Sequence, residues 1–179
     1  MIFLARHGET AHNAEGRFQG QVAVGLTERG VQQAHELAAV AAEREWAGLY
    51  CSPLRRARQT ADIVAARIGL TPIPDDRFME ADAGTWTDRL YTEIEADDPE
   101  GWAAYHETDP DFRFPGGESL EELMERAVDG FVAVTHGGLL PALIVCHRGV
   151  IRAARSHTHI RGLETFMAWD VPNGTLEPL

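Results

Sequence analysis

Short apolar runs alternate with helical periodicities along the chain. Ile2–Ala5 is a continuous apolar run that stops at Arg6, and Gly48–Cys51 and Ala142–Cys146 are runs of the same kind. Runs of about four to eight such residues are typical of strands that are buried on both faces of a parallel sheet. Two further strands are predicted at Thr71–Ile73 and Thr165–Val171.

The segments between the first strands carry apolar residues at helical spacing. A polar, glycine-punctuated stretch at 8–26 is predicted to be a long loop. Thr27 can cap the helix that follows, whose apolar face consists of Val31, Ala34, Ala38 and Ala41. Ser52 and Pro53 provide a cap and a first-turn proline for a second helix, which extends to about Ile68.

The second half of the chain begins with a segment of different composition. Residues 75–117 are acidic and aromatic and are interrupted by prolines, so they are predicted to be an excursion with one or two short helices. The capping box formed by Ser119 and Glu122 starts a helix that ends at His136. A short helix is expected from about Val150.

Strands and helices therefore alternate, which predicts an α/β fold: a three-layer sandwich with a mostly parallel central sheet flanked by helices. The length of 179 residues suits a single domain over 1–179. The excursion at about 75–117 is expected to cover the functional site of that domain rather than to fold separately.

Composition excludes several classes of function. Asp and Glu number 28 against 16 Lys and Arg, so the net charge of −12 argues against a nucleic-acid partner and against an anionic membrane. All the basic residues are arginine, which excludes Schiff-base, pyridoxal and P-loop chemistry. The N-terminus lacks the pattern of a signal peptide or a membrane span, and Cys51 and Cys146 fall in apolar runs. Buried thiols and a cytoplasmic location are expected.

Polar side chains follow three of the predicted strands directly. Arg6 and His7 follow the first, Ser52 follows the second, and His147 follows the strand at 142–146. The carboxyl ends of parallel strands meet at one edge of a sheet, which is where ligands bind in such folds. Arginines, histidines and the start of a helix at that edge indicate a phosphate site that contains an imidazole.

Five motifs in order resemble the signature of the histidine phosphatase superfamily, also called the phosphoglycerate mutase-like family. The first is Arg6-His7-Gly8-Glu9-Thr10 with Asn13 behind it, and the second is Ser52-x-Leu54-x-Arg56-Ala57. Glu80 with Gly84 and Trp86 resembles the general-acid segment. The others are Pro115-Gly116-Gly117-Glu118-Ser119 with Arg126, and His147-x-Gly149-Val150-Ile151-Arg152. The resemblance spans residues 3–152 and implies a phosphoglycerate mutase-like fold.

The resemblance implies a role for each matching position. His7 would attack phosphorus and form a phosphohistidine, and His147 would donate a hydrogen bond to the transferring group. Arg6, Asn13 and Arg56 would bind phosphate oxygens. Glu80 would protonate the leaving oxygen and then activate water. No metal and no cofactor are implied.

The substrate pocket is predicted to include Arg17, Gln19 and Gly20 of the loop at 8–26, together with Arg148. Arg148 departs from the family pattern, which usually has glycine after this histidine, and it can reach the substrate or crowd the pocket. Thr87-Asp88 after Trp86 is a second departure. Both departures bear on the identity of the substrate more than on the chemistry.

Three other groups compete for these roles. Asp82 lies close to Glu80 and is an alternative general acid. His136-Gly137-Gly138 resembles the second-histidine motif superficially, but it completes one helical period, so His147 is preferred. His157-x-His159 has the spacing of a metal pair, but without a third ligand nearby it is interpreted as an exposed helix end.

The predicted function is a metal-independent phosphomonoesterase that hydrolyses a small phosphorylated metabolite through a phosphohistidine. The first alternative is a cofactor-dependent phosphoglycerate mutase, although the 67 residues from Glu80 to His147 leave little room for the longer insertion of that branch. The second is a non-catalytic module that binds a phosphorylated ligand. The sequence leaves the oligomeric state open, a homodimer included.

Overall fold

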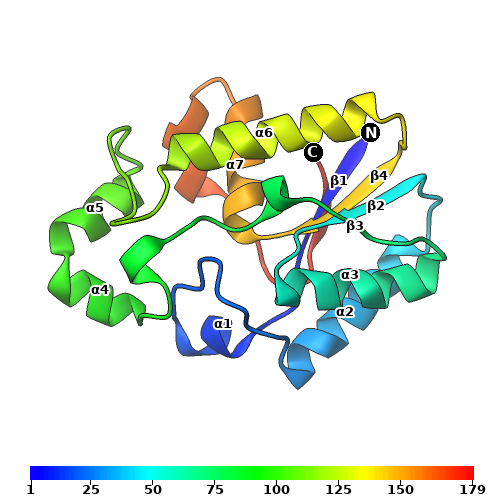
Figure 1. The fold of residues 1–179 in the computed structure, drawn as a ribbon, viewed down its shortest axis with the longest axis horizontal. Helices are drawn as coiled ribbons and strands as arrows, with labels where there is room; N and C mark the ends of the chain where they lie inside the picture. The colour runs from blue at the N-terminus through cyan, green and yellow to red at the C-terminus, as the bar shows by residue number, and fades with distance from the viewer.

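A five-stranded sheet forms the centre of the computed structural model, which describes residues 1–179 (Figure 1). The strand order is β3-β2-β4-β1-β5, in which β1–β4, β4–β2 and β2–β3 are parallel and β5 is antiparallel to β1. The strands are β1 (Ile2–Arg6), β2 (Gly48–Cys51), β3 (Ile73–Pro74), β4 (Ala142–Cys146) and β5 (Leu176–Pro178). The predicted mostly parallel α/β sandwich is confirmed.

Seven α-helices and three 3₁₀-helices connect and cover these strands. The α-helices are α1 (Ala11–Glu15), α2 (Glu28–Ala41), α3 (Arg55–Ile68), α4 (Tyr91–Asp97), α5 (Pro99–Glu107), α6 (Leu120–His136) and α7 (Arg148–Thr158). The 3₁₀-helices are η1 (Asp76–Phe78), η2 (Gly84–Trp86) and η3 (Gly162–Ala168). No helix has the length and the apolar character that a membrane span needs.

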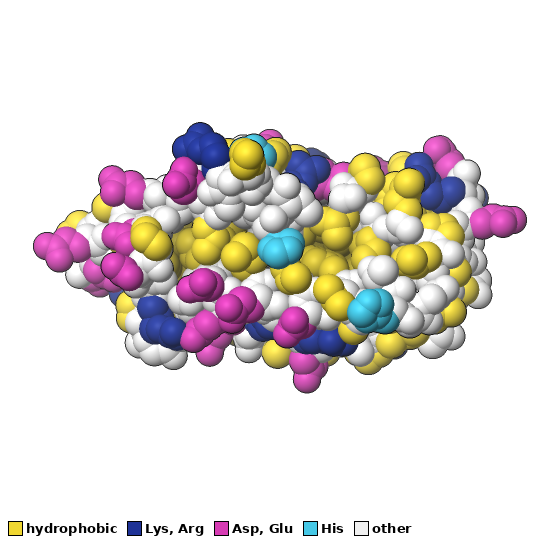
Figure 2. Space-filling model, turned by 90° about the horizontal axis from the view of Figure 1, so that it is seen from above, with side chains coloured by type: hydrophobic (Ala, Val, Ile, Leu, Met, Phe, Trp, Pro, Cys, Tyr) yellow, Lys and Arg dark blue, Asp and Glu magenta, His cyan; other side chains and the backbone are white.

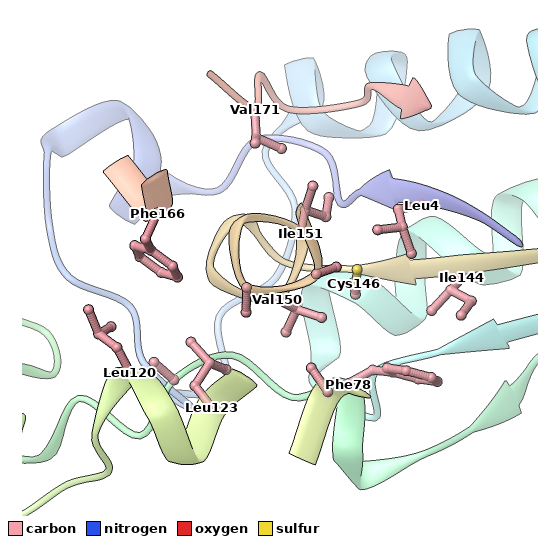
Figure 3. Close-up of a cluster of buried hydrophobic side chains, with 14 of the residues drawn as sticks. Leu4, Phe78, Leu120, Leu123, Ile144, Cys146, Val150, Ile151, Phe166 and Val171 are labelled. Atoms are coloured by element: carbon pink, nitrogen blue, oxygen red, sulfur yellow. The ribbon is translucent and has the colours of Figure 1, made fainter. Parts of the chain in front are cut away.

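The alternation of side chains along β1 separates the two halves of the core. Phe3 and Ala5 pack with apolar residues of α2 and α3, whereas Ile2 and Leu4 pack with those of α6 and α7. Figure 3 shows the second cluster, in which Leu123 of α6 and residues of α7, β1 and β4 meet. The sheet is therefore covered on both faces, as a parallel sheet requires.

One surface of the molecule, to which α6 contributes, carries many hydrophobic side chains. Figure 2 shows this surface from above, with hydrophobic side chains along its middle and acidic side chains around its edges. A shallow apolar groove there is lined by residues of α6, α7 and both termini, among them Phe131, Val132, His136, His157 and Leu179.

Most predicted elements are present with shifted ends. Thr27 caps α2, although Val31 is exposed and Leu37 takes part in the buried face instead. Ser119 and Glu122 form the predicted capping box of α6, which ends at His136 as expected. The strand expected at 71–73 is β3 at 73–74, and the helix expected from about Val150 begins two residues earlier.

Three predictions of local structure are wrong. The loop at 8–26 contains a short helix, α1, which Thr10 caps. Helix α3 begins at Arg55 rather than after Ser52, because the Ser52 hydroxyl accepts from Leu54 N and bonds to His147 instead of capping the helix. Residues 165–168 belong to η3 and residues 169–171 to the loop behind it, so no strand forms there; the last strand is β5, which pairs with the open edge of β1.

Candidate active site

Three strand ends meet at the carboxyl edge of the sheet, as the sequence predicts. The backbone of His7 donates to Cys146 O, and that of Ser52 donates to Val145 O. These two bonds continue the β1–β4 and β2–β4 ladders one step beyond the strands. The imidazole rings of His7 and His147 consequently lie 5.1 Å apart, centroid to centroid, and both are buried.

The neighbours of His7 fix its tautomer and its charge. Nδ1 lies 2.7 Å from the carbonyl oxygen of Gly8, which can only accept, so Nδ1 carries the proton and Nε2 has a free lone pair. Burial lowers the pKa of His7 well below its usual value, and the charges of Arg56 and Arg6 lower it further. His7 is therefore a neutral imidazole with a nucleophilic nitrogen.

His147 is oriented by Ser52. Its Nε2 lies 2.8 Å from Ser52 Oγ, which accepts from the backbone N–H of Leu54. The hydroxyl hydrogen can then be donated to Nε2, which places the ring proton on Nδ1, a buried atom with no hydrogen-bond partner in the protein. Burial, followed by the charge of Arg56, lowers the pKa of this histidine well below its usual value. His147 thus offers a neutral N–H donor beside His7.

Two buried arginines accompany the histidines. Arg6 donates to Val171 O, and Arg56 donates to the carbonyls of Gly20 and Val22. Burial lowers the pKa of each guanidinium to about 10, so both remain charged at neutral pH. The Nε of each has no partner in the protein. Buried cations with donors to spare are suited to bind an anion.

Backbone groups hold Glu80 at the same site. Its carboxylate accepts from Gly149 N at 3.2 Å and from Ala81 N at 3.1 Å. Arg126 holds the preceding backbone, because it donates to the carbonyl oxygens of Arg77, Met79 and Glu80. A carboxyl group thus lies beside the first turn of α7, which directly follows His147.

A cavity of about 40 Å³ joins these groups. Arg6, His7 and Glu80 line it, as do Asn13, Arg17, Gln19, Gly20 and Arg148 of the predicted site. Arg17 is also paired with Glu15, and Asn13 accepts from Thr10 N. Arg56 and His147 do not line the cavity, but the ring of His147 lies next to that of His7 and the charge of Arg56 acts on His7. The excursion contributes Tyr91, Tyr105 and Phe114 to the lining.

The competing groups lie elsewhere. Asp82 is exposed, accepts from Gly84 N and does not line the cavity. His136 is exposed at the last turn of α6 and lines the apolar groove on the outside of that helix. His157 is exposed at the end of α7, and no group of three or more His, Cys, Asp or Glu side chains is placed to hold a metal ion.

Some residues of the site were not predicted. Arg152 belongs to the motif that begins at His147 but was given no place in the predicted site, and it lines the cavity one helical turn after Arg148. The role of Ser52 as the partner of His147 and the bond from Asn173 to His7 O gave no sequence signal, because both depend on contacts between distant segments.

The whole chain matches the histidine phosphatase superfamily (branch 1), over residues 2–179. The chain belongs to this superfamily. It is 35% identical over 157 residues to phosphoglycerate mutase-like protein 4 of Arabidopsis thaliana, a match that covers 79% of this chain and 68% of that protein. It is also 35% identical over 159 residues to a metal-independent phosphoserine phosphatase of the same plant, with 85% of this chain and 66% of that protein covered.

Solved structures of this superfamily have the same fold. A mycobacterial glucosyl-3-phosphoglycerate phosphatase in complex with VO3 superposes with a TM-score of 0.89 at 29% identity, over 98% of this chain and 90% of that one. The relatives include proteins named as phosphatases and proteins named as phosphoglycerate mutases. The histidine phosphatase architecture therefore covers the described chain from end to end.

Proposed function

We propose that this protein is a phosphomonoesterase that hydrolyses a small phosphorylated metabolite through a phosphohistidine on His7. The observation that carries the proposal is the state of His7: it is buried and neutral, with its proton on Nδ1 and with Arg6 and Arg56 beside it. A neutral imidazole nitrogen among cations is suited to attack the phosphorus of an anionic ester. Residues 1–179 would act as one catalytic unit, with the excursion over the site.

The first half-reaction transfers the phosphoryl group to the enzyme. The lone pair of His7 Nε2 forms a bond to phosphorus while the bond from phosphorus to the ester oxygen breaks. Glu80 gives its carboxyl proton to the departing oxygen, which leaves as an alcohol. Arg6, Arg56 and the Nδ1–H of His147 stabilise the charge on the transferring group.

The second half-reaction returns the enzyme to its starting state. The carboxylate of Glu80 takes a proton from water, whose oxygen attacks the phosphorus as the phosphorus–nitrogen bond breaks. Phosphate leaves, and Glu80 is protonated again for the next cycle. The loose transition state of phosphoryl transfer needs positioning and charge stabilisation above all.

A mutase is the alternative within the superfamily, since several relatives are named probable phosphoglycerate mutases. That branch carries a longer insertion after the general acid, and the 67 residues from Glu80 to His147 leave little room for it. Hydrolysis is therefore the better-supported reaction.

The chain is proposed to work in the reducing cytoplasm as a protein with a small-molecule substrate. Cys51 and Cys146 are both free and buried, which supports this location. A homodimer is compatible with the structure.

The test is hydrolysis of an aryl phosphate in the presence of EDTA. We expect turnover with the chelator present and an acid-labile phosphoprotein after rapid quenching. His7→Gln should abolish both, whereas His35→Gln, at an exposed position of α2, should change neither. Turnover by the His7 variant, or activity that a chelator removes and a divalent metal restores, would disprove the proposal.

A further inference from the structure

Two arginines on the cavity wall have no role in the proposed chemistry. Arg148 and Arg152 lie four residues apart on α7 and both line the cavity that contains Arg6, His7 and Glu80. Both also line a second cavity of about 270 Å³, which opens beside Trp102 and Met167. They therefore separate the site of the reacting phosphate from the space beyond it.

Neither arginine is paired with a carboxylate. Arg148 has one side-chain hydrogen bond, to the hydroxyl of Tyr91 at 3.2 Å. Arg152 donates to Trp169 O at 3.0 Å and to the sulfur of Met167. By contrast, Arg155 on the same helix forms an ion pair with Glu177. The two cavity arginines thus keep donors and charge that the protein does not satisfy.

The two arginines bring like charges close together. Arg148 is the first residue of α7, where the helix dipole repels cations. Like charges four residues apart on a helix repel each other. Burial lowers the pKa of Arg152, and the charge of Arg148 lowers it further. Two neighbouring cations that have no carboxylate partner and face one cavity are suited to bind an anionic ligand.

The charge of the whole site points the same way. Arg6, Arg148 and Arg152 line the cavity with one carboxylate, Glu80, and Arg56 adds a further positive charge next to His7. The other acid near Arg152 is Asp170, which is exposed. A bound phosphate dianion offsets two positive charges, and an ionised Glu80 offsets a third. At least one positive charge therefore remains near the cavity that Arg148 and Arg152 line.

We propose that Arg148 and Arg152 form a subsite for a second anionic group, so that the substrate is a phosphomonoester that also carries a carboxylate or a second phosphate. The inference rests on the proposed function, because it places the reacting phosphate at His7. The planar fork of arginine matches either group with paired hydrogen bonds. The neighbouring rings of Phe18, Tyr91 and Tyr105 exclude water and strengthen this attraction.

The test measures binding of inert phosphonates by calorimetry. Phosphonoacetate, 3-phosphonopropionate and 4-phosphonobutyrate are each compared with the uncharged-tail alkylphosphonate of the same chain length. A fourth ligand, propane-1,3-diphosphonate, represents a second phosphate. A charge-assisted subsite should make at least one doubly anionic ligand bind about 10- to 100-fold more tightly than its matched alkylphosphonate.

The variants Arg148→Gln and Arg152→Gln should each reduce this preference to less than about threefold. The control is Arg155→Gln on the same helix, which should keep it, because that arginine is paired with Glu177 outside the cavity. If a phosphonocarboxylate binds most tightly, the second group is a carboxylate; if propane-1,3-diphosphonate does, it is a phosphate. The subsite is wrong if the wild-type protein shows no preference, or if the preference survives in both glutamine variants.

Hydrolysis of an aryl phosphate by the same preparations separates this inference from the proposed function. A protein that is inactive but prefers doubly anionic ligands would refute the phosphatase proposal and leave the subsite standing. An active phosphatase without the preference would refute the subsite alone.

Discussion

The two buried histidines differ in which nitrogen faces a protein partner, and this difference leaves each ring with a different free group. The Nδ1–H of His7 donates to Gly8 O, so its Nε2 is free to attack. His147 uses Nε2 for Ser52 and presents Nδ1 instead. Both rings carry their proton on Nδ1, but the carbonyl of Gly8 occupies the N–H of His7 and leaves a lone pair free, whereas the hydroxyl of Ser52 occupies the lone pair of His147 and leaves an N–H free.

Replacement of His147 tests its role as a donor. His147→Gln should lower kcat/KM for phosphomonoesters by about 10²–10³-fold, since this is the usual cost of losing one donor to developing charge. The same substitution at His136 should change kcat/KM less than about twofold, because His136 is exposed on the far end of α6. Steady-state kinetics decide the matter. The opposite pattern would return the second-histidine role to His136.

Glu80→Gln tests the general acid. An alkyl ester expels a poor leaving group that needs a proton, whereas an activated aryl ester largely does without one. Single-turnover phosphorylation should therefore slow by about 10²–10⁴-fold with alkyl substrates and much less with aryl ones. Decay of the phosphohistidine should slow too. Asp82→Asn is the matched control, because Asp82 lies outside the cavity. Equal losses on both substrates would show that Glu80 only positions the substrate.

At the scale of elements, the segment directly after β1, residues 7–10, is in close backbone contact with the first turn of α2. A Cβ added at Gly30 would lie 2.1 Å from Glu9 O, and one added at Gly8 would lie 2.2 Å from Gly30 O. The two glycines thus let the segment after β1 approach α2 more closely than any side chain allows. A shift of the first turn of α2 would therefore displace the segment that carries His7.

Gly30→Ala separates this contact from helix propensity. Propensity alone predicts that alanine stabilises α2 by about 1 kcal/mol. The steric overlap with Glu9 costs about 1–3 kcal/mol. We therefore expect a net loss of stability in urea unfolding, together with a lower kcat as the loop that carries His7 shifts. Gln32→Ala, at an exposed position of the same helix, should change stability by less than about 0.5 kcal/mol. A more stable Gly30 variant with full activity would disprove the link.

For the whole molecule, the depressed pKa values of His7 and His147 couple folding to pH. Both pKa values lie well below 6.5 in the folded protein because of burial and of nearby arginines. Below pH about 6.5 the unfolded chain binds protons that the folded protein does not. The free energy of unfolding should therefore fall as pH decreases through this range, by up to roughly 1.4 kcal/mol per pH unit for each histidine.

Urea unfolding at pH 5.5, 6.5 and 7.5 measures this dependence. His147→Gln removes one of the two buried imidazoles and should make the slope between pH 5.5 and 6.5 shallower by about half. His35→Gln removes an exposed imidazole and should leave the slope unchanged. A wild-type protein whose stability is flat across these pH values would mean that the two histidines are not held neutral by the fold.

The sequence by itself determined the three central strands of the sheet, the helices that cover them and the edge at which the site lies. β1, β2 and β4 are continuous apolar runs that end in polar side chains, and α2 and α6 have capping residues and helical periods. These signals are local, so they can be detected without knowledge of the fold. The motif order then placed His7, Arg6 and Glu80 around one cavity, as the structure has them.

Tertiary contacts decided the rest. Ser52 bonds to His147 rather than capping α3, because β2 and β4 are neighbours only in the folded sheet. The expected strand at 165–171 is absent because residues 165–168 belong to η3, which packs on α7. Three residues without a strand signal, 176–178, pair with β1 instead, because its edge is open. The charge excess at Arg148 and Arg152 is likewise a property of the folded site. It depends on which carboxylates the fold brings near those two arginines and which it does not.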